Sequence, residues 1–173
     1  EQYFNRLLWV NADGSFLHYD KRHLFSFAGE HFHYSAGKER TLVELKGWRI
    51  CPQICYDLRF PVWSRNSATE PYDLLIYVAN WPSSRSYVWK SLLMARAIEN
   101  MAYCVGVNRI GEDGHGLPHS GDSVVLDFKG REVVKAPVGE AFLKTTSLDY
   151  EQLQDFRDRF AVGPDWDLFE IRP

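Results

Sequence analysis

Cysteines and long apolar runs are scarce in this sequence. It has three cysteines in 173 residues, and so small an odd number does not make a disulfide framework. We therefore interpret Cys51, Cys55 and Cys104 as thiols in a reducing compartment. The longest purely apolar run, Leu74 to Ala79, is far shorter than the roughly 20 residues that a membrane-spanning helix needs, and the first residues lack a signal-peptide pattern. We expect a cytoplasmic protein with no membrane partner.

An excess of positive charge is also absent. The net charge is −3, and the lysines and arginines are spread along the chain. A nucleic-acid-binding surface requires clustered basic residues, so we exclude that class of function. The length and the hydrophobic fraction of 45% are typical of one globular domain with its own core. We assign residues 1–173 to a single domain.

Metal-binding patterns are weak. Three residues separate Cys51 from Cys55, which is not the spacing of a zinc knuckle, and the sequence has no second cysteine pair. The histidines available to such a site are His31, His33, His115 and His119. We expect no metal site and no cofactor.

What the sequence does contain is a series of short segments rich in aromatic and β-branched residues, a composition typical of strands. We predict strands over residues 6–10, 15–20, 41–45, 48–55, 74–80, 103–109, 123–128 and 142–148. The segments Asn11–Gly14 and Asp127–Gly130 have the residues that tight hairpins require. Part of the sheet is therefore expected to be antiparallel.

Two segments have the apolar period of a helix. From Ser86 onward, Trp89, Leu93, Ala97 and Met101 recur at every fourth position. A second helix is predicted over residues 149–160, with apolar side chains on one face and charges on the other. Strands that alternate with helices indicate a layered α/β domain with a mixed sheet.

Cys55 lies where a predicted strand turns sharply into the start of a helix, with Pro61 suited to the first helical turn. Backbone N–H groups and the helix dipole at such a junction favour an anion, so we expect the pKa of the Cys55 thiol to be lowered. The same turn leaves the N–H of Tyr56 free to stabilise a developing oxyanion. We interpret Cys55 as a candidate nucleophile, and Cys51 and Cys104 as core residues.

The stretch from Tyr19 to Gly37 has neither a helical nor a strand period, which is typical of a functional loop. Lys21, at its start, would place a cation beside a thiolate and later beside a tetrahedral oxyanion. Glu30 lies nine positions further on and is expected to orient Lys21 or to accept a proton. We assign no chemical role to His31 and His33.

Four motifs together carry a family resemblance. They occur as YDKRHLF over residues 19–25, ICYDLRFP over 54–61, ANWP over 79–82 and ARAIEN over 95–100. In this order and at these spacings they resemble the nitrilase, or carbon–nitrogen hydrolase, superfamily. With the stretch that begins at Ala28, the chain is similar to the bacterial ω-amidases of that superfamily, which hydrolyse 2-oxoglutaramate and similar terminal amides. The resemblance implies an αββα sandwich.

The resemblance also implies roles for particular residues. Cys55 attacks the amide carbon to form a thioester, Lys21 and the Tyr56 amide stabilise the transition state, and Glu30 matches the accessory glutamate that follows the lysine. Asn80 and Trp81 are expected to line the pocket.

Binding partners follow from the same likeness. The substrate is expected to be a small-molecule amide, and Arg85 is the candidate for binding the distal carboxylate of a 2-oxo-dicarboxylic monoamide. The chain is expected to form a homodimer, to which Trp166, Phe169 and Ile171 of an irregular C-terminal tail (residues 165–173) contribute.

Two polar groups are assigned to the scaffold. Arg96, Glu99 and Asn100 are predicted to form a buried polar network that holds the helix in place. Asp57 and Arg59 are expected to pair with each other or with nearby backbone.

The general base of this family is a glutamate on an earlier strand, and Glu1 is the only glutamate before Lys21. We expect the domain to be N-terminally incomplete, because the earlier stretch would also supply strands that complete the sheet. Three alternatives stay open: a different carbon–nitrogen specificity, such as an N-carbamoyl acid or an aliphatic amide; a non-catalytic member that lacks the base; and, weakest, a papain-like hydrolase, for which no histidine lies in a matching motif.

Overall fold

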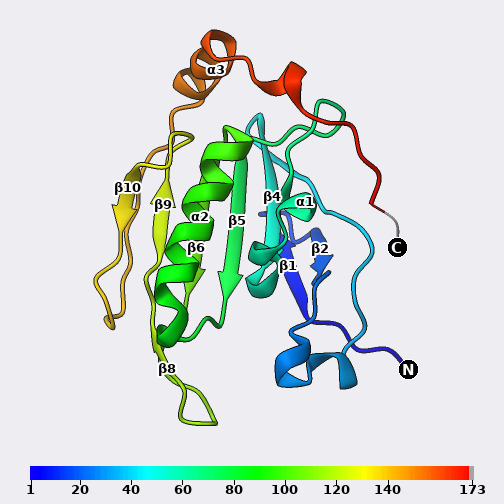
Figure 1. Ribbon diagram of the computed structural model, residues 1–173, viewed down its shortest axis with the longest axis vertical. Helices are drawn as coiled ribbons and strands as arrows, with labels where there is room; N and C mark the ends of the chain where they lie inside the picture. The colour runs from blue at the N-terminus through cyan, green and yellow to red at the C-terminus, as the bar shows by residue number, and fades with distance from the viewer. Residues whose placement is uncertain (172–173) are drawn as a thin grey trace.

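The computed structural model describes residues 1–171 and builds them around one six-stranded mixed sheet (Figure 1). The strands lie side by side in the order β10-β9-β6-β5-β4-β3. Their bounds are β3 Val43–Leu45, β4 Trp48–Ile54, β5 Leu74–Ala79, β6 Tyr103–Asn108, β9 Val124–Leu126 and β10 Glu132–Lys135. Two separate antiparallel pairs complete the β structure: β1 Arg6–Val10 with β2 Phe16–Asp20, and β7 Ile110–Glu112 with β8 Pro118–Ser120.

The centre of the sheet is parallel. Strands β4, β5 and β6 pair in parallel, whereas β3, β9 and β10 join by antiparallel pairing. Strand β5 lies between two parallel partners and consists entirely of apolar residues, a composition typical of parallel strands at the centre of a sheet. Parallel strands also deliver their carboxyl ends to one edge of the sheet, where ligands of such sheets usually bind.

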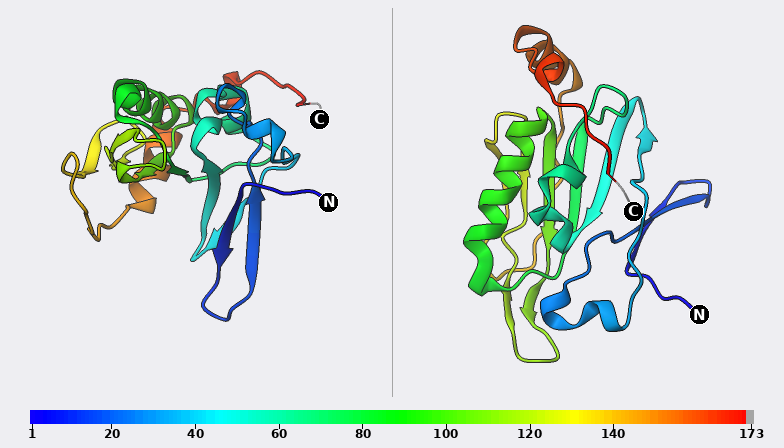
Figure 2. Two further views of the ribbon diagram at one scale, coloured as in Figure 1. Left: turned by 90° about the horizontal axis from the view of Figure 1, so that it is seen from below. Right: turned by 45° about the vertical axis from the view of Figure 1, so that its right-hand side comes forward.

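Helix α2 (Ser86–Asn100) covers one face of the sheet (Figures 1 and 2). Its apolar ridge of Trp89, Leu93 and Ala97 is fully buried, as the four-residue recurrence predicts. The helix packs tightly against β6 at Gly106, where an added Cβ atom would lie 2.4 Å from Leu93 Cδ1. This glycine lets the helix pack directly on the sheet.

A second core lies on the opposite face. It combines Ile50, Leu74, Tyr103 and Phe128 of the sheet region with Leu153 of helix α3 (Tyr150–Arg159). The β1–β2 hairpin extends away from the sheet on the side opposite α2 (Figure 2).

Near the carboxyl ends of their strands, Val78 and Val107 are 36% and 49% exposed. Part of the sheet surface is therefore apolar and accessible.

The predicted polar network at the end of α2 is confirmed. Arg96 donates to Glu99 Oε1 at 2.9 Å and to the Leu58 carbonyl at 2.7 Å. Asn100 Nδ2 bonds to the Arg96 carbonyl, and Asn100 Oδ1 accepts the Asn66 backbone N–H. The network ties the helix to the segment that follows Cys55.

Most predicted elements agree with the structure, including both hairpin turns and both helices, with Asp149 as the N-cap of α3. The predicted strand over residues 142–148 is wrong. Phe142 to Ser147 are exposed and form no regular structure, and among residues 1–171 no strand pairs with them. The short strands β7, β8 and β10 were not predicted, since three or four residues are too few to show a clear period.

Within residues 1–171, no helix combines the length and the apolar character that crossing a membrane demands. The same residues contain no cluster of three or more histidine, cysteine or acidic side chains arranged to hold a metal ion. In the tail, Phe169 and Ile171 are partly exposed, and their contribution to a dimer stays a prediction. Arg172 and Pro173, also part of the predicted tail, lie outside the described residues.

Candidate active site

Three parallel strands end at one edge of the sheet, and each is followed by a polar or reactive residue. Strand β4 leads into Cys55, β5 into Asn80 and Trp81, and β6 ends on Asn108. Because parallel strands have aligned carboxyl ends, residues that are distant in sequence meet here. This edge is the candidate active site.

Cys55 lies on a sharp strand-to-helix turn. Its φ angle is +46°, in the left-handed region that non-glycine residues rarely adopt. A 3₁₀ helix, Cys55–Arg59, begins at this residue, and α1 (Pro61–Ser64) follows with Pro61 in its first turn, as predicted. Tyr56 is the second residue of the 3₁₀ helix, so its N–H precedes the first intrahelical hydrogen bond. The turn therefore presents a thiol and a backbone donor together.

The expected lowering of the Cys55 pKa is wrong for this structure. Burial raises the pKa of the thiol, and a backbone hydrogen bond at Asn80 together with the positive charge of Lys21 opposes this rise without cancelling it. Desolvation of a thiolate outweighs the favourable helix start, because Cys55 is partly buried. Use of Cys55 as a nucleophile would therefore require a proton acceptor.

Lys21 and Glu30 form a close, shielded ion pair. Lys21 Nζ lies 2.6 Å from Glu30 Oε2, and the two side chains are only 4% and 13% exposed. Glu30 also accepts the Phe25 N–H and, at 2.9 Å, a hydrogen bond from Asn5 Nδ2. Burial works to raise the pKa of Glu30, but these donors outweigh it and leave the pKa lowered. Glu30 is therefore ionised and anchors Lys21.

Trp81 is fixed by a residue that sequence reasoning missed, Asn108. Asn108 Oδ1 accepts the Trp81 N–H at 2.8 Å, and Asn108 Nδ2 donates to the carbonyls of Trp81 and Gly121, both at 2.9 Å. Trp81 is buried and packs against Trp89. The sequence signal that could have identified Asn108 is an asparagine at the end of the strand next to β5.

Asn80, which was predicted to line the pocket, has an exposed side chain. Its backbone carbonyl oxygen lies 3.9 Å from Cys55 Sγ.

A small pocket opens beside Cys55, lined by aromatic rings and two arginines. Arg85 lies over the Phe25 ring at 5.4 Å and Arg59 lies over the Trp81 ring at 5.2 Å. The expected pairing of Asp57 with nearby backbone is confirmed, since Asp57 accepts the Ile54 N–H. The same expectation for Arg59 is wrong, because its guanidinium lies over the Trp81 ring and lines the pocket instead. No acidic side chain of residues 1–171 lines this pocket. Its walls therefore carry positive charge only.

His31 and His33, to which no chemical role was assigned, are exposed on the loop beyond Glu30. Cys51 and Cys104 are fully buried, and burial raises their pKa values, that of Cys51 to about 11. The structure thus brings Cys55, Tyr56, Asn80, Trp81 and Arg85 together around one pocket. Lys21 and Glu30 do not line this pocket, but their charges act on the Cys55 thiol.

The site thus combines a cysteine on a strained strand-to-helix turn with a buried lysine–glutamate pair on an α/β sheet. The family profile described as carbon–nitrogen hydrolase matches residues 1–158. The chain belongs to the carbon–nitrogen hydrolase family.

Individual relatives are more specific. The chain is 55% identical over 165 residues to an omega-amidase, YafV, of Yersinia enterocolitica, covering 95% of this chain and 64% of the relative. It is 33% identical over 163 residues to the 2-oxoglutaramate amidase of Bacillus subtilis, covering 94% of this chain and 62% of the relative. The chain thus spans a little under two thirds of the length of these curated relatives.

The same fold occurs in a solved structure. The crystal structure of XC1258 from Xanthomonas campestris, a CN-hydrolase superfamily protein with an arsenic adduct in its active site, matches with a TM-score of 0.95 and 50% identity. The match covers 98% of this chain and 66% of that chain. The nitrilase-type fold expected from the motifs is therefore confirmed.

Proposed function

We propose that this protein hydrolyses a small amide that carries a carboxylate at its far end, such as 2-oxoglutaramate, to a carboxylate and ammonia. The observation that carries the proposal is that Cys55, at its strained turn, lines a pocket with Arg59 and Arg85, while the charges of the buried Lys21–Glu30 pair act on its thiol. Similarity to curated omega-amidases and to a 2-oxoglutaramate amidase supports it.

In the first half of the reaction, the Cys55 thiol gives its proton to the general base, which the family resemblance implies is a glutamate on an earlier strand, and its sulfur attacks the amide carbon. The carbonyl oxygen becomes an oxyanion, which Lys21 and the Tyr56 N–H stabilise. The tetrahedral intermediate then collapses, the C–N bond breaks, and the nitrogen leaves as ammonia after it has gained a proton. A thioester on Cys55 remains.

In the second half, a water molecule gives a proton to the base and attacks the thioester carbon. The C–S bond breaks, the acid product leaves and the thiol is restored. Glu30 is engaged by Lys21, Asn5 and the Phe25 amide. We therefore assign Glu30 to holding Lys21 in place and not to proton transfer.

The arsenic adduct in the active site of the X. campestris relative also supports a cysteine nucleophile. Thiolates are the soft ligands of proteins, and arsenic is a soft element that binds them. Because Cys51 and Cys104 are fully buried, Cys55 is the thiol of this chain that an adduct or a substrate can reach.

The pocket favours a substrate with a distal anion. Arg59 and Arg85 flank the thiol without an acidic counterpart among the pocket walls, and guanidinium groups bind carboxylates in a bidentate geometry. A neutral aliphatic amide would leave both charges without a partner. An N-carbamoyl acid also carries a carboxylate, but its hydrolysis releases carbon dioxide together with ammonia.

The test is ammonia release from 2-oxoglutaramate, an aliphatic amide and an N-carbamoyl amino acid. We expect turnover of the first and its complete loss in Cys55→Ala, with Cys104→Ala as a matched control that retains turnover. Iodoacetamide should label the wild type and Cys104→Ala but not Cys55→Ala. Labelling of Cys55 without ammonia release from any of the three amides would instead support a non-catalytic binding protein.

A further inference from the structure

Asp57 lies two residues after Cys55 and is completely buried. Its carboxylate contacts four polar groups. Oδ2 accepts hydrogen bonds from Tyr19 Oη at 2.7 Å and from the Ile54 N–H at 3.1 Å. Oδ1 lies 2.9 Å from both the His23 N–H and His23 Nδ1. All of the acceptor positions of the carboxylate are thus used.

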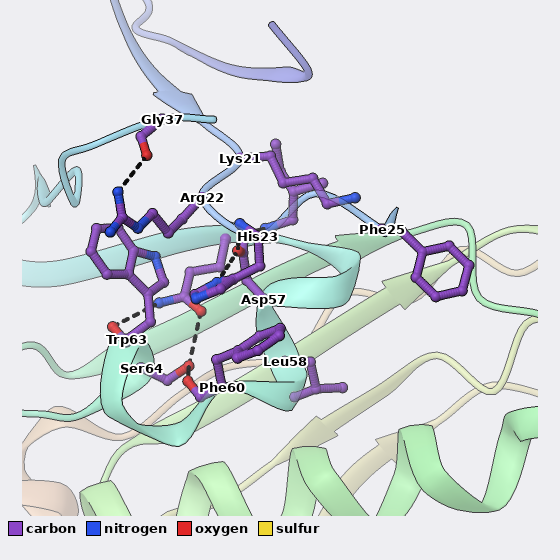
Figure 3. Close-up of polar contacts among 12 residues, drawn as sticks. Lys21, Arg22, His23, Phe25, Gly37, Asp57, Leu58, Phe60, Trp63 and Ser64 are labelled. Carbon is purple, nitrogen blue, oxygen red and sulfur yellow. Dashed lines mark hydrogen bonds and ion pairs between the residues drawn. The ribbon is translucent and has the colours of Figure 1, made fainter. Parts of the chain in front are cut away.

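These four contacts connect the two segments that carry the proposed chemistry. Ile54 immediately precedes Cys55, whereas Tyr19 and His23 lie two residues before and two residues after Lys21. Figure 3 shows the segment with Lys21, Arg22 and His23 lying against the turn that carries Asp57 and Leu58. A single carboxylate therefore spans the gap between the lysine segment and the cysteine turn.

The surroundings hold this bridge rigid. Trp63 Nε1 donates to Tyr19 Oη at 2.9 Å, and the His23 ring stacks on Phe60 with a centroid distance of 3.7 Å. The lysine segment is also held from its other side, where the Lys21 N–H donates to the Asn5 carbonyl and the Lys21 carbonyl accepts the Gly37 N–H. The lysine segment and the cysteine turn both bind to Asp57. The two carboxylate oxygens of Asp57 therefore set the distance between the lysine segment and the cysteine turn.

A buried carboxylate is costly, and packing alone does not require one. Direct activation of the thiol does not explain Asp57 either, because its negative charge raises the pKa of Cys55. Its benefit is geometric, since each of its oxygens contacts two partners along fixed directions.

We propose that Asp57 is a positioning residue that sets the distance between the Lys21 ammonium and the Cys55 sulfur, with Tyr19 and His23 as its connections to the lysine segment. The role in turnover rests on the proposed amidase function, but the role in placing Lys21 beside the thiol does not. The two are therefore measured separately.

The experiment compares Asp57→Asn with Asp73→Asn in the full chain. Asp73 is a matched control because it is also a buried carboxylate, accepts a backbone N–H from Arg49 and pairs with Arg157 at 2.7 Å, yet it precedes β5 at the opposite end of the sheet. The rate of iodoacetamide labelling of Cys55 is measured against pH, which reports thiol ionisation without any substrate. Melting temperature, kcat and KM are measured alongside.

For Asp57→Asn we expect the pKa of labelling to rise and kcat to fall by about 10- to 100-fold, with little change in KM, because a misplaced lysine no longer stabilises anionic sulfur or oxygen. Asp73→Asn should lower the melting temperature but leave labelling and kcat near wild type. If the labelling pKa falls in Asp57→Asn, direct charge repulsion is the dominant effect and the proposal is wrong. Equal behaviour of the two variants would reduce Asp57 to a structural residue and overturn it as well.

If Asp57→Asn fails to fold, Tyr19→Phe takes its place, because it removes one hydrogen bond to Asp57 and keeps the ring packing. The same rise in labelling pKa is expected, to a smaller extent, and an unchanged pKa would refute the positioning role. If the wild type labels at Cys55 but releases no ammonia from any amide, the proposed function fails while the labelling comparison still decides the role of Asp57.

Discussion

Replacing Glu30 by glutamine tests how the protein keeps a buried lysine in place. Lys21 is 4% exposed and has Glu30 as its ion-pair partner at 2.6 Å. In the variant, a glutamine oxygen can still accept the Phe25 N–H. Its NH2 group, however, then faces the Asn5 amide, another donor, and the ammonium of Lys21 loses its counter-charge.

Removing one partner of a buried pair is strongly destabilising, but the retained hydrogen bond offsets part of the loss. We expect the free energy of unfolding to fall by about 2–3 kcal/mol at neutral pH. Because Lys21 is no longer held beside the thiol, kcat should also fall by about 100-fold.

The pH dependence of this loss provides the sharper test. Hydrogen bonds from Lys21, Phe25 and Asn5 lower the pKa of Glu30 in the folded protein against the opposing effect of burial. A carboxyl group with a lowered folded pKa stabilises the protein fully above its unfolded pKa, roughly 4.3, and this contribution disappears as the pH falls through the folded value. The difference between wild type and Glu30→Gln should therefore be largest at neutral pH and shrink in acid.

Urea unfolding at a series of pH values measures this difference. Glu44→Gln, at an exposed position on β3, is the control and should change stability by less than about 0.5 kcal/mol at any pH. A wild-type-to-variant difference that stays constant from neutral pH into acid would show that the charge of Glu30 is not what stabilises the pair.

The remaining predictions concern the thiol, the pocket and the core. Cys55→Ala abolishes iodoacetamide labelling, because Cys51 and Cys104 are fully buried. Mass spectrometry measures the labelling, and a labelled Cys55→Ala protein would contradict this prediction. Arg85→Ala raises KM for 2-oxoglutaramate about 10-fold with little change in kcat, and an unchanged KM in steady-state assays removes the proposed contact. Gly106→Ala lowers the free energy of unfolding by about 1–3 kcal/mol, because the new Cβ atom would lie 2.4 Å from Leu93 Cδ1 and 2.8 Å from Trp89 Cζ2. A variant that melts at the same temperature as the wild type would contradict this close packing.

Local sequence patterns predicted most of the fold. The ridge from Trp89 to Ala97 and the apolar run of β5 each extend over several residues, so their periods are visible without knowledge of neighbours. Residues 142–148 show the limit of this approach. A strand requires a partner that satisfies its backbone groups, and nothing in the local sequence reveals whether such a partner is near.

The candidate site was predicted unevenly for a related reason. Cys55, Lys21 and Glu30 were found because each belongs to a dense motif. Asn108 and the bridging role of Asp57 were missed, because their importance depends on contacts with residues far away in the chain. The position of Arg59 at the pocket was also missed. Arg59 follows Asp57 by two residues, which favours a local ion pair, and only the structure shows that the Trp81 ring binds the guanidinium instead.

By itself, the sequence determined the family and the order of the main strands and helices along the chain, and it predicted Cys55 as the nucleophile with Lys21 as its cation. These properties reside in short motifs and in local periodicity. The tertiary structure decided the direction of the Cys55 pKa shift, because burial raises that pKa although the local helix start favours a thiolate. It also decided which charges face the pocket and how Asp57 joins the lysine to the cysteine. Desolvation and electrostatic interaction depend on distance in space, and that distance exists only once the parallel strands have aligned their carboxyl ends.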